Sequence, residues 1–185
     1  MSLQKTWNNN PKVKNVTNRF TAVLFIIYLI VLCWILLLKL GVRFSYMTTR
    51  RVNLIPFKEA VIVNGKMDVP ETLLNVIIFV PLGIYAAILF GRWSFVKKLF
   101  FFFLLSLLIE ALQYILAIGS FDITDIITNT SGGIIGLLLF KAIEKIFNDT
   151  AKATEVVNTI AAMGTVIIIV FLLLLKLDML PIRYR

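Results

Sequence analysis

The sequence of 185 residues contains no histidine and a single cysteine, and only 16% of its residues are charged. The missing histidines exclude a histidine-ligated metal and a Ser-His-Asp catalytic triad. One cysteine excludes a disulfide bond within the chain. Ordinary soluble domains carry about 25% charged residues, so this chain has too little charge to cover a soluble surface of its size.

Acidic residues are also scarce, with 10 Asp and Glu against 19 Lys and Arg, which gives a net charge of +9. A strongly basic chain is typical of proteins that bind nucleic acid or an anionic membrane surface. Hydrophobic residues make up 59% of the sequence and include 15 Phe. A soluble or disordered chain could not hide this much apolar surface. The composition therefore predicts membrane lipids, and no nucleic acid, as the partner.

Five apolar runs divide the chain, and Glu110 is the one charged residue within them. A helix that crosses a bilayer needs about 20 apolar residues, although about 17 suffice. Four runs meet this length, and the fourth in order has to extend into its flanks. The sequence therefore predicts an all-α polytopic membrane protein, a bundle of five transmembrane helices. The runs cover residues 20–38, 72–91, 99–121, 126–140 and 156–175.

These runs also predict the organisation of the chain. We expect a tail over residues 1–19, a membrane domain over 20–147, a fifth transmembrane helix over 156–177 and a tail over 178–185. The first run is longer than the apolar core of a signal peptide, about 7–15 residues, so we interpret it as a membrane anchor. The membrane domain would hold an outer loop over 41–70 and helices near 20–40, 71–91, 97–118 and 123–147.

Lysines and arginines indicate the orientation of a membrane protein because they gather in its cytoplasmic loops. Here they are divided almost evenly between the two sides of the predicted bundle. The cations before the first helix and in the loop after the second favour a cytoplasmic N-terminus. The loop over residues 41–70 would then lie outside.

Polar residues gather at the end of the predicted helices that adjoins this loop. A carboxylate within a membrane helix costs about 2.5–3.5 kcal/mol, so Glu110 must find a partner, face water or stay protonated. Ser106 and Gln113 lie four residues before it and three after it, which places all three on one helix face. This stripe is either a structural knot of hydrogen bonds between helices or a functional site, and a charge at this depth favours the site.

A second stripe follows on the fourth predicted helix, where Asp122, Asp125, Asn129, Gly132 and Gly136 step along one face. Asp favours the N-cap of a helix, so Asp122 is equally well interpreted as a cap or as a member of the site. Asp125 and Asn129 favour the site. The GxxxG spacing permits close approach of two backbones, and we expect it to serve packing inside the bundle rather than dimerisation.

The second predicted helix begins near Asn75 and contains Pro81, which we interpret as a tolerated kink. In the long loop, residues 53–57 are apolar around a proline and too short to span, which favours a re-entrant or interfacial segment. We expect Arg50 and Arg51 beside it to hold an anion, such as a lipid phosphate or a carboxylate of the same chain.

Four blocks of these residues resemble the VanZ family. In chain order they are Arg50-x-x-Asn53-Leu54-x-Pro56-Phe57, Asn75-Val76-Ile77-Ile78-Phe79-x-Pro81-x-Gly83, Glu110-x-x-Gln113 and Asp122-x-x-Asp125-x-x-x-Asn129-Thr130-x-Gly132-Gly133-x-x-Gly136. The resemblance implies a bacterial plasma-membrane protein that contributes to glycopeptide resistance, against teicoplanin more than vancomycin. It implies no settled catalytic residues. The ligand-binding candidates are the motif residues Arg50, Asn53, Asn75, Glu110, Gln113, Asp122, Asp125 and Asn129.

Three functions fit these residues. We favour a protein that binds or alters a membrane lipid, a lipid-linked cell-wall precursor or the lipid tail of a lipoglycopeptide at the outer face. The second function is an enzyme that modifies a phospholipid or a polyprenyl phosphate, with Glu110 and Asp125 as catalytic candidates and a divalent cation at Asp122 and Asp125. The third is a small transporter subunit, which the apolar inner halves of the helices disfavour. We assign no cofactor, metal ligand or catalytic residue from the sequence.

Overall fold

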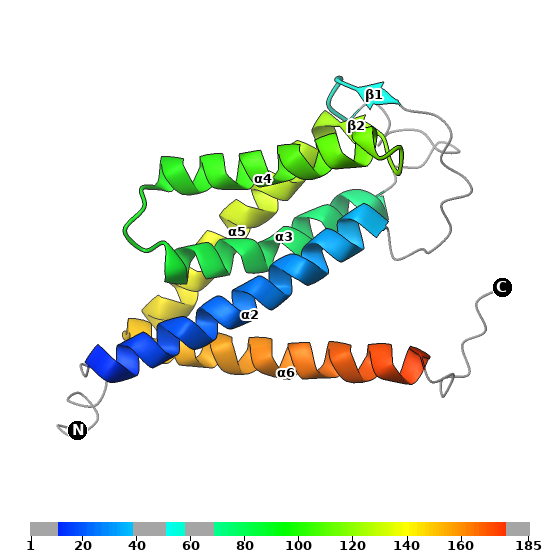
Figure 1. The fold of residues 1–185 in the computed structure, drawn as a ribbon. Coiled ribbons are helices and arrows are strands. Elements are labelled where there is room, and N and C mark those ends of the chain that lie inside the picture. Colours follow the sequence, from blue (N-terminus) through cyan, green and yellow to red (C-terminus); the bar gives the residue numbers. More distant parts are fainter. Residues whose placement is uncertain (1–10, 39–50, 58–68, 177–185) are drawn as a thin grey trace.

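The computed structural model describes residues 11–38, 51–57 and 69–176, which form five helices and two short strands (Figure 1). The all-helical prediction is confirmed for these residues. The helices are α2 (Pro11–Leu38), α3 (Val69–Leu89), α4 (Phe95–Ile115), α5 (Ile123–Phe147) and α6 (Thr150–Lys176). The strands are β1 (Val52–Asn53) and β2 (Phe121–Asp122).

Three of the helices contain segments long and apolar enough to cross a membrane within the described residues: Asn18–Leu37 in α2, Thr72–Leu89 in α3 and Ile123–Phe147 in α5. The helix α4 carries Lys97, Lys98 and Glu110 within its 21 residues. A bundle with five spanning helices therefore stays a prediction, whereas three membrane-competent helices are observed.

All five helices begin before the apolar runs that predict them, and α2 and α6 do so by the most residues. The helix α2 begins at Pro11, because proline is favoured in the first helical turn. The helix α6 begins at Thr150, two residues after Asn148, which has a left-handed conformation with φ 48° and caps the end of α5. Charged residues interrupt an apolar run without interrupting a helix, so these helices extend beyond the segments suited to the bilayer.

The helices α3 and α5 form the most extensive contact in the bundle, and α4 packs next against α5. Glycines permit the close approach of α3 and α5. A Cβ on Gly132 would lie 2.2 Å from the carbonyl oxygen of Val76, and one on Gly136 would lie 2.0 Å from that of Val80. The prediction that the GxxxG face packs inside the bundle is confirmed.

Aromatic residues join α2 to α3. Phe25 packs against Tyr85, with ring centroids 5.5 Å apart. The hydroxyl of Tyr28 donates a hydrogen bond of 2.7 Å to the carbonyl oxygen of Ile78, in the turn before Pro81. Pro81 has no amide to offer the carbonyl oxygen of Ile77, and the hydroxyl of Tyr28 adds a hydrogen bond at the neighbouring carbonyl in the same turn.

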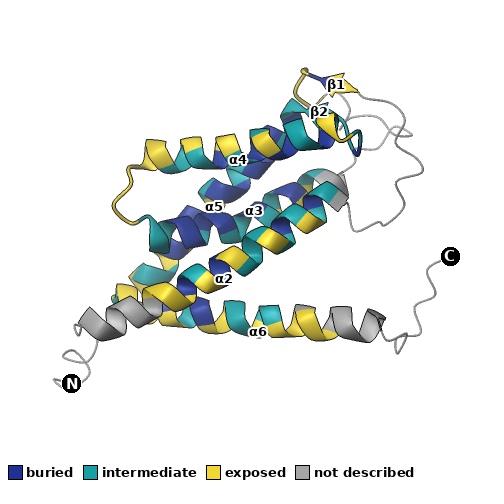
Figure 2. Ribbon diagram, viewed as in Figure 1, coloured by how far each residue is buried: buried dark blue, intermediate teal, exposed yellow. Residues whose placement is uncertain are grey.

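The helix α6 meets α2 near the beginning of both helices and diverges from it toward its C-terminal end (Figure 1). Thr21 and Asn158 exchange two hydrogen bonds at this crossing, of 3.1 and 2.9 Å. Figure 2 shows exposed residues along the outward faces of the helices. Many of them are large and apolar, such as Ile30 and Leu108. Exposed apolar surface of this extent indicates a membrane protein.

Candidate functional site

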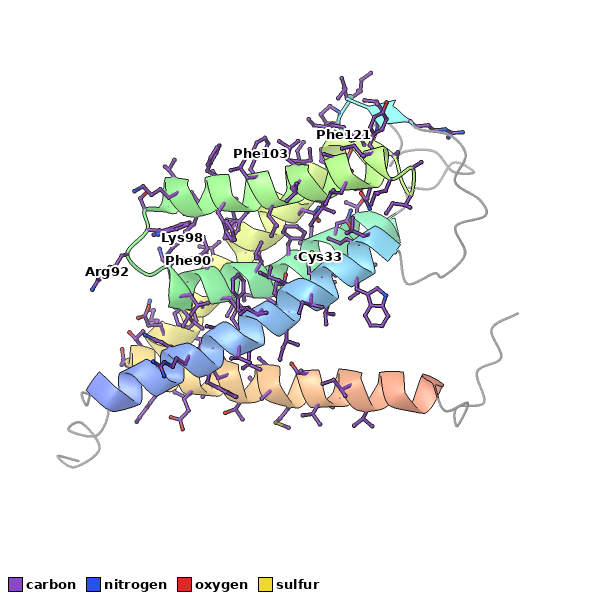
Figure 3. All side chains as sticks on the ribbon, viewed as in Figure 1. Cys33, Phe90, Arg92, Lys98, Phe103 and Phe121 are labelled. Carbon is purple, nitrogen blue, oxygen red and sulfur yellow. The ribbon has the colours of Figure 1, made fainter. Side chains whose placement is uncertain are left out.

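Seven of the eight predicted site residues lie in the described part of the chain, and we call them the polar cluster: Asn53, Asn75, Glu110, Gln113, Asp122, Asp125 and Asn129. Arg50, the eighth, lies outside the described residues. The cluster begins where β1 and β2 pair in parallel, with Val52 opposite Phe121 and Asn53 opposite Asp122. Figures 1 and 3 show this pairing at one end of the helices, where Phe121 is labelled.

Asp122 caps α5, as one of the two interpretations predicts, and its side chain also contacts Asn53, whereas its role in a functional site stays a prediction. Its Oδ1 accepts a hydrogen bond of 2.7 Å from the amide of Thr124, as an N-cap residue does. Its Oδ2 accepts a hydrogen bond of 3.0 Å from Nδ2 of Asn53. Oδ1 of Asn53 in turn accepts a hydrogen bond from the backbone amide of Ile55. The two residues tie the loop segment to the first turn of α5.

Glu110 is buried, with 2% of its surface exposed. Its Oε2 accepts a hydrogen bond of 3.0 Å from the backbone amide of Asp122, which lies at the N-terminus of α5. The positive end of a helix dipole and an amide donor both favour a carboxylate at this position. The predicted need of Glu110 for a partner is therefore met in part by the backbone that precedes α5.

The side chains of α3 and α5 meet at Asn75 and Asp125. Nδ2 of Asn75 donates a hydrogen bond of 2.7 Å to Oδ1 of Asp125. The backbone carbonyl of Asp125 also accepts from the hydroxyl of Thr128. Asp125 is half-buried whereas Asn75 is buried. The side-chain amide of Asn75 therefore holds the carboxylate of Asp125 at the edge of the interface between α3 and α5.

Deeper between α4 and α5, the side-chain amide of Asn129 donates a hydrogen bond of 2.9 Å to the hydroxyl of Ser106. Asn129 is 1% exposed, and its Oδ1 accepts no hydrogen bond from the residues that the structure describes. From the same face of α4, Nε2 of Gln113 donates a hydrogen bond of 2.9 Å to the carbonyl oxygen of Leu36, near the end of α2. The polar stripe of α4 therefore faces two neighbours, α5 through Ser106 and Glu110 and α2 through Gln113.

The sequence that builds this arrangement matches a known family. Residues 25–148 match the VanZ/LLP1 family. The chain belongs to this family. It is 36% identical over 152 residues to Protein VanZ of Enterococcus faecium, a match that covers 80% of this chain and 89% of that relative. No solved structure matches the chain.

The resemblance to the VanZ family is therefore confirmed. The VanZ/LLP1 match includes the whole polar cluster and the glycine contact between α3 and α5. The helix α6 begins after the matched residues end. The family region thus coincides with the part of the molecule that builds the cluster.

Sequence reasoning missed one member of this VanZ/LLP1 site. The hydroxyl of Thr124 accepts a hydrogen bond of 3.0 Å from the backbone amide of Phe57. Thr124 is buried and lies two residues after the cap residue Asp122. A threonine in the first turn of an apolar helix is unremarkable in sequence, and its partner lies 67 residues away. The signal that could have located it is its position between two motif aspartates.

The chemistry that the VanZ/LLP1 cluster offers is that of carboxylates held by amide donors. Asn53 and Asn75 each donate to one aspartate, and both oxygens of Asp122 accept protein donors. Within the ranges that the structure describes, no three Asp, Glu or Cys side chains gather as a metal ion would require. The divalent cation at Asp122 and Asp125 stays a prediction.

Proposed function

We propose that this VanZ/LLP1 protein crosses the bacterial plasma membrane several times, with its N-terminus in the cytoplasm. Its polar cluster would then lie at the outer face, where it binds a lipid or a lipid-linked envelope component and lowers susceptibility to glycopeptides, teicoplanin in particular. Family membership and the similarity to Protein VanZ support the resistance role. The three apolar helices support the membrane location.

One observation carries the binding proposal. The carboxylates of the cluster and exposed apolar side chains lie at the same end of the helices. Glu110 and Asp125 are held by donors at that end. Leu54 and Ile55, which follow β1, are 64% and 55% exposed. Apolar side chains beside a polar cluster suit the headgroup level of a bilayer, where a ligand presents both a polar head and an acyl chain.

The proposed placement would account for a preference for teicoplanin, which carries an acyl chain that vancomycin lacks. Burial of each CH₂ group is worth about 0.8 kcal/mol, so a site at membrane depth discriminates through the chain. We expect protection to increase with the acyl-chain length of the drug. Equal protection against analogues with and without the chain would exclude recognition of the acyl chain.

The experiment that tests the proposal is a teicoplanin and vancomycin susceptibility series in a sensitive Gram-positive host. The variants are Glu110→Gln and Asp125→Asn, which keep the shape of each side chain and remove its charge. Arg50→Ala tests the predicted anion partner in the loop. Lys145→Ala, at an exposed position of α5, is the control. The membrane level of each variant is measured by immunoblot.

Loss of protection by Glu110→Gln and Asp125→Asn at normal membrane levels is the expected result, because each retains a hydrogen-bond acceptor but no charge. Lys145→Ala should protect as wild type does. Full protection by both amide variants would show that the carboxylates serve only to hold the helices together, and the proposal would fail.

A further inference from the structure

The opposite end of the helices, where α3 turns into α4, carries positive charge. Lys98 lies in the first turns of α4, and Lys141 lies near the end of α5. At 1.5 Å per residue, Lys141 lies roughly 28 Å along α5 from Asp122. This end is therefore separate from the polar cluster.

The packing of α4 on α5 brings the two lysines to the same end of the helices, about 6 and 12 Å beyond the contact between Phe102 and Gly133. Phe102 is fully buried and lies against Gly133, where a Cβ would be 2.5 Å from its ring. Lys98 lies one turn before Phe102 on the same face of α4, and Lys141 lies two turns after Gly133. Because the two helices are antiparallel, both steps lead toward the same end. Partial burial, and the charge of Lys141, lower the pKa of the Lys98 ammonium.

The carboxylates near this end have other partners. Glu144 accepts a hydrogen bond from the hydroxyl of Thr150, and Asp149 accepts one of 2.8 Å from the amide of Ala151. In the part of the chain that the structure describes, no ion pair joins Lys98 or Lys141 to a carboxylate. Two like charges that repel each other in a partly buried site are unfavourable, and an anion between them would remove the repulsion.

Aromatic side chains lie at the same end. Phe90 stacks on Trp93, with ring centroids 4.5 Å apart and an interplanar angle of 18°, and Phe101 packs edge-on against Phe90. Figure 3 shows Lys98 and Phe90 between the start of α4 and the end of α3, whereas Arg92 points away from the helices. Tryptophan is enriched at the headgroup level of membranes. Lys98 thus lies beside an aromatic surface of the kind that suits the headgroup level of a bilayer.

We infer that Lys98 and Lys141 bind the phosphate of an anionic phospholipid in the leaflet at this end. The stacked Phe90 and Trp93 contact the glycerol backbone and the first part of the acyl chains. Free phosphate offers the same oxygens to the lysines but has nothing for the aromatic surface to contact. The site is distinct from the polar cluster and does not depend on the function proposed for that cluster.

The test is a lipid titration of the full-length protein in detergent, in which native mass spectrometry counts the bound lipids. The probes are dioleoyl phosphatidylglycerol, which is anionic, and dioleoyl phosphatidylcholine, which has no net charge. We expect wild type to bind phosphatidylglycerol about tenfold more tightly, since each lysine near an anionic headgroup contributes a several-fold effect. The double variant Lys98→Gln/Lys141→Gln should lose this preference.

The matched control is Lys97→Gln/Lys145→Gln, which removes two exposed charges from the same two helices and should keep the preference. Equal loss in both double variants would overturn the inference, because the effect would then be one of net charge. Absence of a preference in wild type, or displacement of phosphatidylglycerol by millimolar inorganic phosphate, would also overturn it. If the double variant fails to fold, the single variant Lys141→Gln replaces it, because it changes an exposed residue. We expect this variant to bind phosphatidylglycerol about threefold more weakly than wild type.

Discussion

The backbone amide of Asp122 donates a hydrogen bond of 3.0 Å to Oε2 of Glu110, so the cap of α5 supports the buried carboxylate of α4. The side chain of Asp122 meanwhile binds Thr124 and Asn53. One residue therefore links α4, α5 and the β1 segment. Loss of its side chain should remove the contacts with Thr124 and Asn53 and leave the backbone amide that supports Glu110 without the cap that positions it.

Asp122→Ala removes the cap of α5 and the acceptor for Asn53. We expect it to destabilise the protein by about 1–2 kcal/mol, the usual effect of losing a helix cap, and to abolish resistance. Thermal unfolding in detergent and susceptibility assays measure the two effects. Ser94→Ala removes the cap of α4 at the other end of the helix and is the matched control, which should lower stability but retain resistance. Retained resistance in Asp122→Ala would contradict the prediction.

Exchanging the partners of the Asn75–Asp125 hydrogen bond separates structural from functional roles. Asn75→Asp alone places two carboxylates at a distance of about one hydrogen bond, and like charges in partly buried positions repel. We expect it to be destabilised. The double variant Asn75→Asp/Asp125→Asn restores one amide and one carboxylate, and its melting temperature should recover.

Resistance should not recover in this double variant, because the charge then lies on α3 instead of α5. Susceptibility of the host at matched membrane levels is the measurement. A double variant that regains both stability and resistance would show that the hydrogen bond alone matters.

Gly136→Ala should destabilise the contact between α3 and α5, since the added Cβ would meet the carbonyl oxygen of Val80 at 2.0 Å. Overpacking of this kind costs about 1–3 kcal/mol. Gly164 in α6 has nothing within 4 Å of an added Cβ. Gly164→Ala should therefore leave stability unchanged or raise it, because alanine favours a helix. Thermal unfolding of the two variants compares them, and equal melting temperatures would contradict the close packing.

The reciprocal hydrogen bonds between Thr21 and Asn158 should couple α2 to α6. A double-mutant cycle with Thr21→Val and Asn158→Leu should give a coupling energy of about 0.5–1.5 kcal/mol, the range found for polar pairs between membrane helices. Unfolding in denaturing detergent is the measurement. We expect resistance to persist in both single variants, since α6 begins after the residues that match the VanZ/LLP1 family. A coupling energy near zero would contradict the pairing.

The sequence predicted the helices because long apolar runs leave a chain few alternatives in a membrane. It also predicted the face that Glu110 and Gln113 share, since helical spacing determines which side chains lie together. It did not predict the pairing of Asn53 with Asp122. Strands of two residues have no periodicity of their own, and their partners lie 69 residues apart. The start of α6 was placed late because Lys152 and Glu155 end the apolar run without ending the helix.

The pairing of Asn53 with Asp122 has a consequence for the order in which the protein assembles. The hydrogen bond closes a loop of 69 residues that contains all of α3 and α4. Closing such a loop is entropically costly, and the cost is met only after the enclosed helices have packed. During synthesis the bond must also wait until Asp122 has left the ribosome. The polar cluster is therefore among the last parts to form, and a nascent chain that stops before α5 carries its buried glutamate without the backbone amide that supports it.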